Sequence, residues 1–177
     1  KTMAEKVAPD ASHLVLYHIV VEGGAFIEMM DWESLQLGTG AVVIFPNRDA
    51  HHMSSGKGVP RPFPNYGISA KIQARDLSPL HVGGGGQVSR FVCGYLTCDP
   101  HLCRPILNGL PPVFKVNIRT DPSAAWLESS IIHLGEEAAS QRVGIEAMIA
   151  KLSEALLVDT LRRHLACLPD RQKGRLT

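Results

Sequence analysis

Three of the four cysteines of this chain, Cys93, Cys98 and Cys103, fall within eleven residues. In a reducing compartment such clustering indicates a metal site or reactive thiols before disulfides. Two adjacent histidines, His51 and His52, offer imidazole nitrogen, which tetrahedral zinc binds together with thiolate sulfur. We therefore predict a zinc site formed by His51, His52, Cys93 and Cys98. Such a site would be structural, or it would sense zinc or a thiol-reactive compound.

A second interpretation of the same residues involves no metal. Cys93 and Cys98 are separated more widely than the cysteines of a C-x-x-C pair. Cysteine is also one of the most frequently buried residue types, so both cysteines fit as apolar fillers, with His51 as a hydrogen-bonded turn histidine. Both interpretations stay open at this stage. Three further ligands are available if a metal is bound: His18, His101 and Cys103.

These residues must be positioned by a β-rich region that extends from residue 13 to about residue 118. Short β-forming stretches alternate there with glycine and proline turns, a pattern typical of an antiparallel sandwich or barrel. The predicted strands are His13–Val21, Ala25–Met30, Ala41–Phe45, His51–Met53, Val88–Thr97 and Val113–Ile118. A long loop is predicted over Ser54–Asn65, which is rich in proline and glycine.

The apolar period becomes helical from Asp121 onward. Asp121 and Pro122 form a helix-start signal, Gly144 opens a second helix, and Pro169 ends it. These two helices carry more apolar surface than one face on a small barrel can hide. We therefore predict a helical hairpin that packs on the barrel and also on a second copy of the chain, which gives a homodimer.

Longer stretches of the sequence resemble a known family. The segment Glu22–His51 resembles the cupin barrel, in which a glycine turn and a Pro-x-x-x-x-His turn bring a histidine onto the inner face; Pro46 and His51 have that spacing. More specific is the order GGGG, RFVCGYLTCD (Arg90–Asp99), RPILNGLPPVFKV (Arg104–Val116) and a helical hairpin. This order resembles the N-terminal cupin-like domain of AraC-type transcription regulators over residues 12 to 168.

The resemblance implies a mainly β fold with C-terminal α structure. We expect a cupin-like, jelly-roll barrel over residues 1–118, an antiparallel two-helix hairpin over 119–168, and a linker over 169–177. It further implies a regulatory domain that senses a small-molecule effector and contacts DNA only through a helix-turn-helix domain missing from this chain. The effector pocket is expected in the barrel interior, with these candidates: Tyr17, Ile19, Phe26, Glu28, Phe45 and Tyr95.

Composition agrees with such a domain and argues against two other classes. The 18 Lys and Arg residues are balanced by 17 Asp and Glu residues, so no basic bias marks a DNA-binding surface. No apolar run approaches the roughly 18 residues that cross a bilayer, and no apolar signal segment opens the sequence. A soluble, cytoplasmic protein is the resulting expectation.

Two rival hypotheses remain. A stand-alone cupin metalloenzyme acting on a small organic substrate would use His18, Glu22 and His51 as a facial ligand set, but the chain lacks the His-x-His pair of such enzymes. No G-x-S-x-G nucleophile motif is present either, so we predict that the chain is not an enzyme. The other rival is a dimerisation module whose barrel is filled and binds no ligand.

Overall fold

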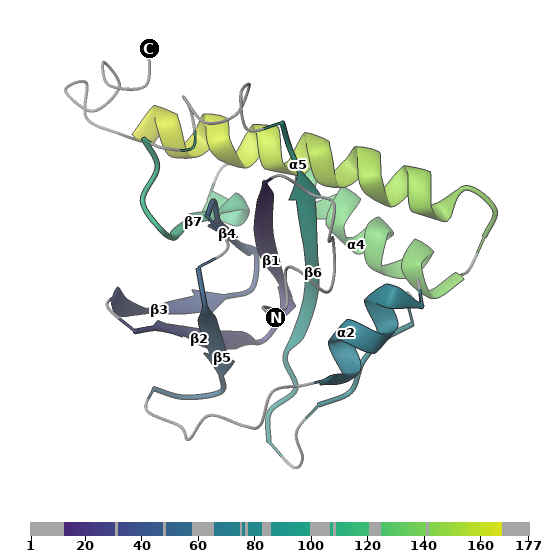
Figure 1. Ribbon diagram of the computed structural model, residues 1–177, viewed down its shortest axis with the longest axis horizontal. Helices are drawn as coiled ribbons and strands as arrows, with labels where there is room; N and C mark the ends of the chain where they lie inside the picture. The colour runs from purple at the N-terminus through teal and green to yellow at the C-terminus, as the bar shows by residue number, and fades with distance from the viewer. Residues whose placement is uncertain are drawn as a thin grey trace.

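The computed structural model of the 177-residue chain describes residues 13–30, 32–47, 49–57, 66–74, 76, 78–82, 86–99, 107, 109–120, 125–140 and 142–167. Within these residues two antiparallel sheets face each other, and two C-terminal helices cover the remaining face of one sheet (Figure 1). The predicted fold class, mainly β with C-terminal helices, is confirmed.

The sheet that contacts the helices is called the first sheet here, and its strands run in the order β6-β1-β4-β7. These strands are β1 (Leu14–Glu22), β4 (Ala41–Phe45), β6 (Arg90–Thr97) and β7 (Phe114–Asn117). The second sheet has the order β3-β2-β5. Its strands are β2 (Gly24–Met29), β3 (Trp32–Gly38) and β5 (His51–Ser54).

Strand β1 is apolar along nearly its whole length because both of its faces are covered. Val15, Tyr17 and Ile19 belong to a core shared with the helices. Leu16 and Val20 belong to a separate core between the two sheets. Alternate side chains of a strand point to opposite faces, so one strand contributes to both layers. The face of the first sheet toward the second sheet is called the inner face below, and the face toward the helices the helical face.

The helices α4 (Ala125–Ser140) and α5 (Ile145–Cys167) form a hairpin on the helical face (Figure 1). The short connection between them includes Gly144, whose φ of +84° suits glycine. Leu127 and Ile131 of α4 and Leu156 of α5 are buried against β1, β4 and β7. Within the described residues, neither these helices nor α2 is both long and apolar enough to cross a membrane.

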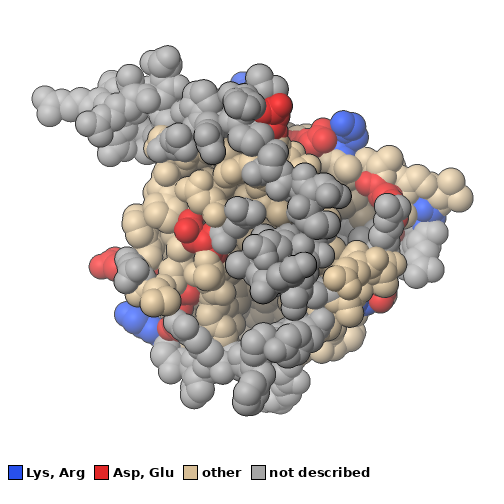
Figure 2. All heavy atoms as spheres, in the orientation of Figure 1, with Lys and Arg blue, Asp and Glu red and all other residues tan. Residues whose placement is uncertain are grey.

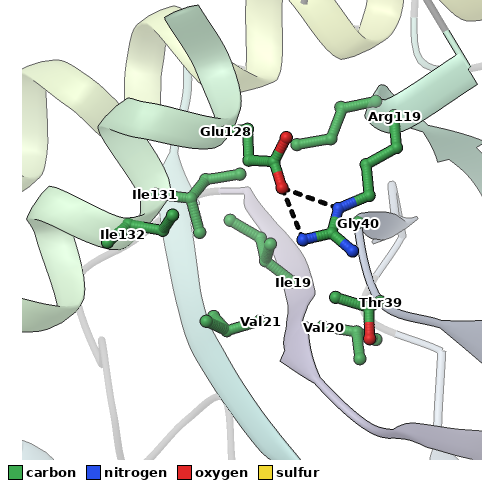
Figure 3. Close-up of a pocket in the computed structure, with 10 residues that line it drawn as sticks. Ile19, Val20, Val21, Thr39, Gly40, Arg119, Glu128, Ile131 and Ile132 are labelled. Atoms are coloured by element: carbon green, nitrogen blue, oxygen red, sulfur yellow. Dashed lines mark hydrogen bonds and ion pairs between the residues drawn. The ribbon is translucent and has the colours of Figure 1, made fainter. Parts of the chain in front are cut away.

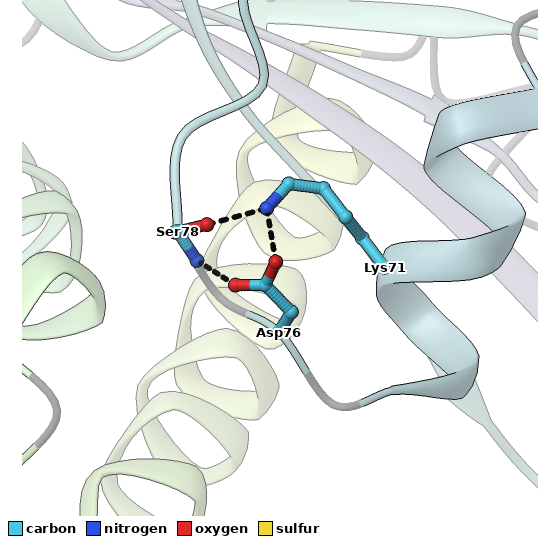
Figure 4. Close-up of polar contacts among 3 residues, drawn as sticks. All are labelled: Lys71, Asp76 and Ser78. Carbon is cyan, nitrogen blue, oxygen red and sulfur yellow. Dashed lines mark hydrogen bonds and ion pairs between the residues drawn. The ribbon is translucent and has the colours of Figure 1, made fainter.

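Strand β3 and helix α2 were not predicted from the sequence. Strand β3, at the edge of the second sheet, has exposed positions that interrupt its apolar pattern. Helix α2 (Tyr66–Gln73) is short. The turn after α2 is closed by Lys71 Nζ, which lies 2.5 Å from both Asp76 Oδ2 and Ser78 Oγ, while the Ser78 amide donates to Asp76 Oδ1 at 2.9 Å (Figure 4). These contacts lower the pKa of Asp76.

Candidate functional site

Three ring side chains meet on the inner side of the barrel, contributed by β1, β4 and β5. Phe45 is fully buried and stacks on His51, with 3.8 Å between ring centroids and 10° between ring planes. His18 meets the edge of Phe45 at 5.8 Å and of His51 at 4.9 Å. This cluster follows from strand alternation, because His18 lies between Leu16 and Val20, which both pack between the sheets.

A chain of hydrogen bonds fixes which nitrogens of the two histidines carry protons. His51 Nδ1 lies 3.0 Å from the Asp49 carbonyl oxygen, which only accepts, so Nδ1 donates. Neutral His51 therefore keeps a lone pair on Nε2, and His18 Nε2 donates to it at 2.8 Å. The remaining nitrogen, His18 Nδ1, is then a bare acceptor. It is buried and has no hydrogen-bond partner among the described residues.

Burial keeps both imidazoles neutral. Burial, together with a smaller contribution from the neighbouring His51, lowers the pKa of His18 to about 3. The pKa of His51 is lowered chiefly by burial, against an opposing contribution from the hydrogen bond to Asp49. Neutral imidazole is the form that accepts a hydrogen bond or binds a metal ion.

We predict that the domain loses stability as the pH falls from 7 to 5. His18 titrates near 6.5 when unfolded and near 3 when folded, so in this window the unfolded chain binds more protons and the free energy of unfolding falls. His18 alone contributes a loss of about 2 kcal/mol. Urea denaturation at both pH values measures it. His18→Gln should reduce the loss by about 2 kcal/mol, and equal stability of the wild type at both pH values would contradict the prediction.

Cys93 lies beside His18 on the inner face. The two residues are paired across β1 and β6, so their side chains share one side of the sheet. Cys93 is exposed and forms no disulfide. Desolvation by the surrounding protein nevertheless raises the pKa of its thiol to about 12, so the thiol is protonated at neutral pH. A protonated thiol is a weak nucleophile, so Cys93 is not expected to react spontaneously. It is better suited to a metal ion that displaces the proton when it binds to sulfur.

The helical face of the same two strands contacts α5. Tyr17 is buried, and its hydroxyl lies 2.7 Å from Ser153 Oγ of α5. Burial raises the pKa of Tyr17. Its ring passes over Gly94, where an added Cβ would come within 2.3 Å of the Tyr17 hydroxyl oxygen. Tyr17 and Gly94 therefore join α5 to the strands that carry His18 and Cys93.

A small depression opens where α4 crosses β1 (Figure 3). It is lined mainly by aliphatic side chains, including Ile19 and Ile131. At its rim Arg119 Nε donates to Glu128 Oε1 at 2.6 Å, and Arg119 Nη2 lies 2.5 Å from the same oxygen. Because these two charged side chains are paired with each other, we assign the depression a packing role.

Comparison with known proteins agrees with this architecture. Residues 3–166 match the family model described as cupin. The chain belongs to the cupin family. It is also 23% identical over 154 residues to an RCS-specific HTH-type transcriptional activator, RclR, of Escherichia coli (strain K12). The match covers 86% of this chain and 44% of the activator, so the chain spans less than half of that relative's length. The predicted resemblance to AraC-type regulators is confirmed.

The cupin fold does not bring the four predicted zinc ligands together. His51 and Cys93 lie on the inner side. His52 follows His51 in β5, so it points to the other face of the second sheet. Cys98 packs against the core shared with the helices. Among the described residues no group of three or more His, Cys, Asp or Glu side chains is arranged to hold a metal ion. This four-residue arrangement was therefore wrong, whereas zinc binding itself stays a prediction.

Only some of the expected effector-pocket residues face the cupin barrel interior. Phe45 lies there, and Tyr95 shares a face with its partner Leu16. Tyr17 and Ile19 instead pack toward the helices. Phe26 and Glu28 alternate with inward-facing Ile27 and Met29, so they lie on the opposite face of the second sheet. The expected inward orientation was wrong for Tyr17, Ile19, Phe26 and Glu28. Whether an effector binds at any of the six positions stays a prediction.

The facial set of the rival enzyme hypothesis is not assembled either. Glu22 lies four residues beyond His18 along β1, about 13 Å at the usual rise of a strand. Its carboxylate is exposed and forms an ion pair with Arg90 at 3.1 Å. Among the further candidates, His101 and Cys103 lie outside the described residues.

The sequence analysis named His18 as a further zinc ligand and as part of the rival facial set with His51, but it did not predict the hydrogen bond between the two histidines, and it did not single out Ser153. The separation of 33 residues between His18 and His51 gives no local pattern. One signal was available for the Tyr17 contact, because glycine inside a strand, here Gly94, often marks a close approach by another group.

Proposed function

We propose that this cupin is the sensory domain of an AraC-type transcription regulator. The observation that carries the proposal is the similarity to a transcriptional activator over 86% of the chain. In this proposal the domain detects a small molecule or ion at the inner face and passes its state to a DNA-binding domain through the helices. A ligand shifts such an equilibrium only if it binds the two states unequally.

The two-sided strand β1 supports this mechanism. Its consecutive residues Tyr17 and His18 point to opposite faces, one toward α5 and the other into the barrel. Strand β6 repeats this arrangement with Cys93 on the inner face and Gly94 beneath the Tyr17 ring. A shift of either strand on ligand binding would displace the Tyr17 contact with Ser153, because the protein interior is closely packed.

The charge distribution supports assigning DNA contact to another domain. The formal net charge is +1. On the face shown in Figure 2, the described Lys and Arg side chains are scattered and lie near Asp and Glu side chains. A surface that binds the phosphate backbone needs clustered positive charge.

Deleting the gene in its host and sequencing the RNA tests the proposed function. We expect a small set of transcripts to change and to be restored by complementation with the complete gene. A complementing copy with Gly94→Ala, which disturbs the contact between sheet and helix, should fail to restore them. An unchanged transcript profile under all growth conditions in which the gene is expressed would contradict the proposal.

We also propose that the hairpin pairs with a second copy of the chain. Its helices expose large apolar side chains, among them Trp126 and Ile132 of α4 and Met148 and Val158 of α5. Sedimentation should show a dimer that Val158→Glu shifts toward monomer. Met30→Glu, in the turn after β2 and 84% exposed, is the matched control and should leave the mass unchanged. A monomeric wild type at high concentration would contradict this prediction.

A further inference from the structure

Two groups suited to binding a metal ion lie side by side on the inner face. His18 Nδ1 is buried and lacks a hydrogen-bond partner in the described part of the chain. A buried acceptor without a partner destabilises the folded state. A ligand that binds His18 Nδ1 would remove this destabilisation. Cys93 is the cross-strand partner of His18, and it is a free cysteine. Opposed residues have Cβ atoms about 5 Å apart, which allows one ion to contact both side chains.

The hydrogen-bond chain through His51 prepares His18 for this role. Histidines that bind a metal usually donate their other ring N–H to an acceptor, which fixes the ring and raises its basicity. His18 Nε2 donates to His51 Nε2, and His51 in turn donates to the Asp49 carbonyl oxygen. The separation of 2.8 Å between the two Nε2 atoms is that of a hydrogen bond. His51 is thus a positioning residue, and the lone pair available to a metal is on His18 Nδ1.

We propose that His18 Nδ1 and Cys93 Sγ bind one soft transition-metal ion. An imidazole and a thiolate together favour zinc or copper over magnesium or calcium. On binding, the Cys93 thiol releases its proton to solvent and sulfur forms the bond to the metal. Two protein ligands leave coordination positions for solvent or a small molecule, so the site suits an exchangeable ion. Of the four ligands predicted from sequence, only Cys93 remains.

The regulatory meaning of this site rests on the proposed function, but metal binding does not. Both ligands adjoin the residues that contact α5, since Tyr17 precedes His18 and Gly94 follows Cys93. An ion that draws β1 and β6 together would therefore act on the helix contact. If zinc binds as proposed and deletion of the gene changes no transcript, the site stands and the proposed function fails.

Calorimetric titration of the purified, reduced chain with Zn²⁺ tests the site. We expect one ion per chain, and a loss of affinity of roughly tenfold or more in both Cys93→Ser and His18→Gln. His52→Gln, on the other face of the second sheet, and Cys167→Ser, an exposed cysteine at the end of α5, are matched controls that should bind like the wild type. With Co²⁺ as the probe, a thiolate-to-metal absorption band should appear in the wild type and be absent in Cys93→Ser.

His51 provides a separate test of the hydrogen-bond chain. His51→Phe should weaken zinc binding, whereas His51→Gln, which keeps an acceptor, should restore part of it. Thermal melts confirm folding of each variant, and the exposed position of Cys93 makes Cys93→Ser the variant least dependent on the core. Absence of zinc uptake, uptake unaffected by Cys93→Ser, or an equal loss in His52→Gln would overturn the proposal.

Discussion

Gly94→Ala should destabilise the domain by about 3 kcal/mol, because the new methyl group would occupy space taken by a buried tyrosine. The added Cβ would lie 2.3 Å from the Tyr17 hydroxyl oxygen and 2.5 Å from its Cζ. The ring has little room to yield, since it belongs to the core shared with the helices and its hydroxyl contacts Ser153. Thermal denaturation should show a Tm lowered by roughly 6–12 °C.

Two further variants separate this effect from a general intolerance of alanine in strands. Gly38→Ala in β3 is the matched control: apart from its chain neighbours, no described residue has an atom within 4 Å of the added Cβ, and φ is not positive, so stability should change little. In a Tyr17→Ala background, Gly94→Ala should lower the free energy of unfolding far less than in the wild type. A double-mutant cycle measures this difference as the coupling energy between the two positions. Equal Tm values for Gly94→Ala and the wild type would show that the Tyr17 ring does not pack over this strand.

Phe45→Ala should lower the free energy of unfolding by about 4 kcal/mol. It should also remove the ring contacts that hold His18 and His51 in place on the inner face. Phe45 is fully buried in the core between the sheets, where it stacks on His51 and contacts the edge of His18. Its removal leaves a cavity that the neighbouring strands can fill only in part. Urea denaturation measures the loss. We also expect the ring NMR signals of His18 and His51 to broaden or shift.

Phe45→Leu is the control for this change, because it keeps most of the buried volume and should cost less than about 1.5 kcal/mol. It also lacks the flat ring, so the His51 signals should still shift while stability is largely retained. If Phe45→Ala were as stable as the wild type, the core between the two sheets would not depend on the Phe45 side chain.

Much of the architecture could be predicted because it follows from local patterns. The β-rich region, the switch to a helical period and the Pro46–His51 turn all involve residues close in sequence. The family resemblance rested on ordered motifs such as CGYLTCD, and the cupin match agrees with it. These features need no knowledge of which strand lies beside which.

The candidate site could not be predicted in the same way, because it depends on the face to which each side chain points. Strand β1 is apolar on both faces, so its sequence does not distinguish inward from outward residues. The register of β1 with β6 decides the matter: it places Cys93 beside His18 and Gly94 beside Tyr17. A shift of one residue would exchange the two faces. Cys98, just after β6, consequently packs toward the helices and not beside His51.

The central claim is that this cupin domain is the sensory part of a transcription regulator, and the reading frame of its gene tests that most directly. We predict that sequencing beyond the codon for Thr177 will reveal about a hundred further codons that encode two helix-turn-helix patterns. Such a gene would join the inner face and its helices to a domain that binds DNA. A stop codon directly after Thr177 would contradict the claim, because the domain would then have no DNA-binding partner in its own chain.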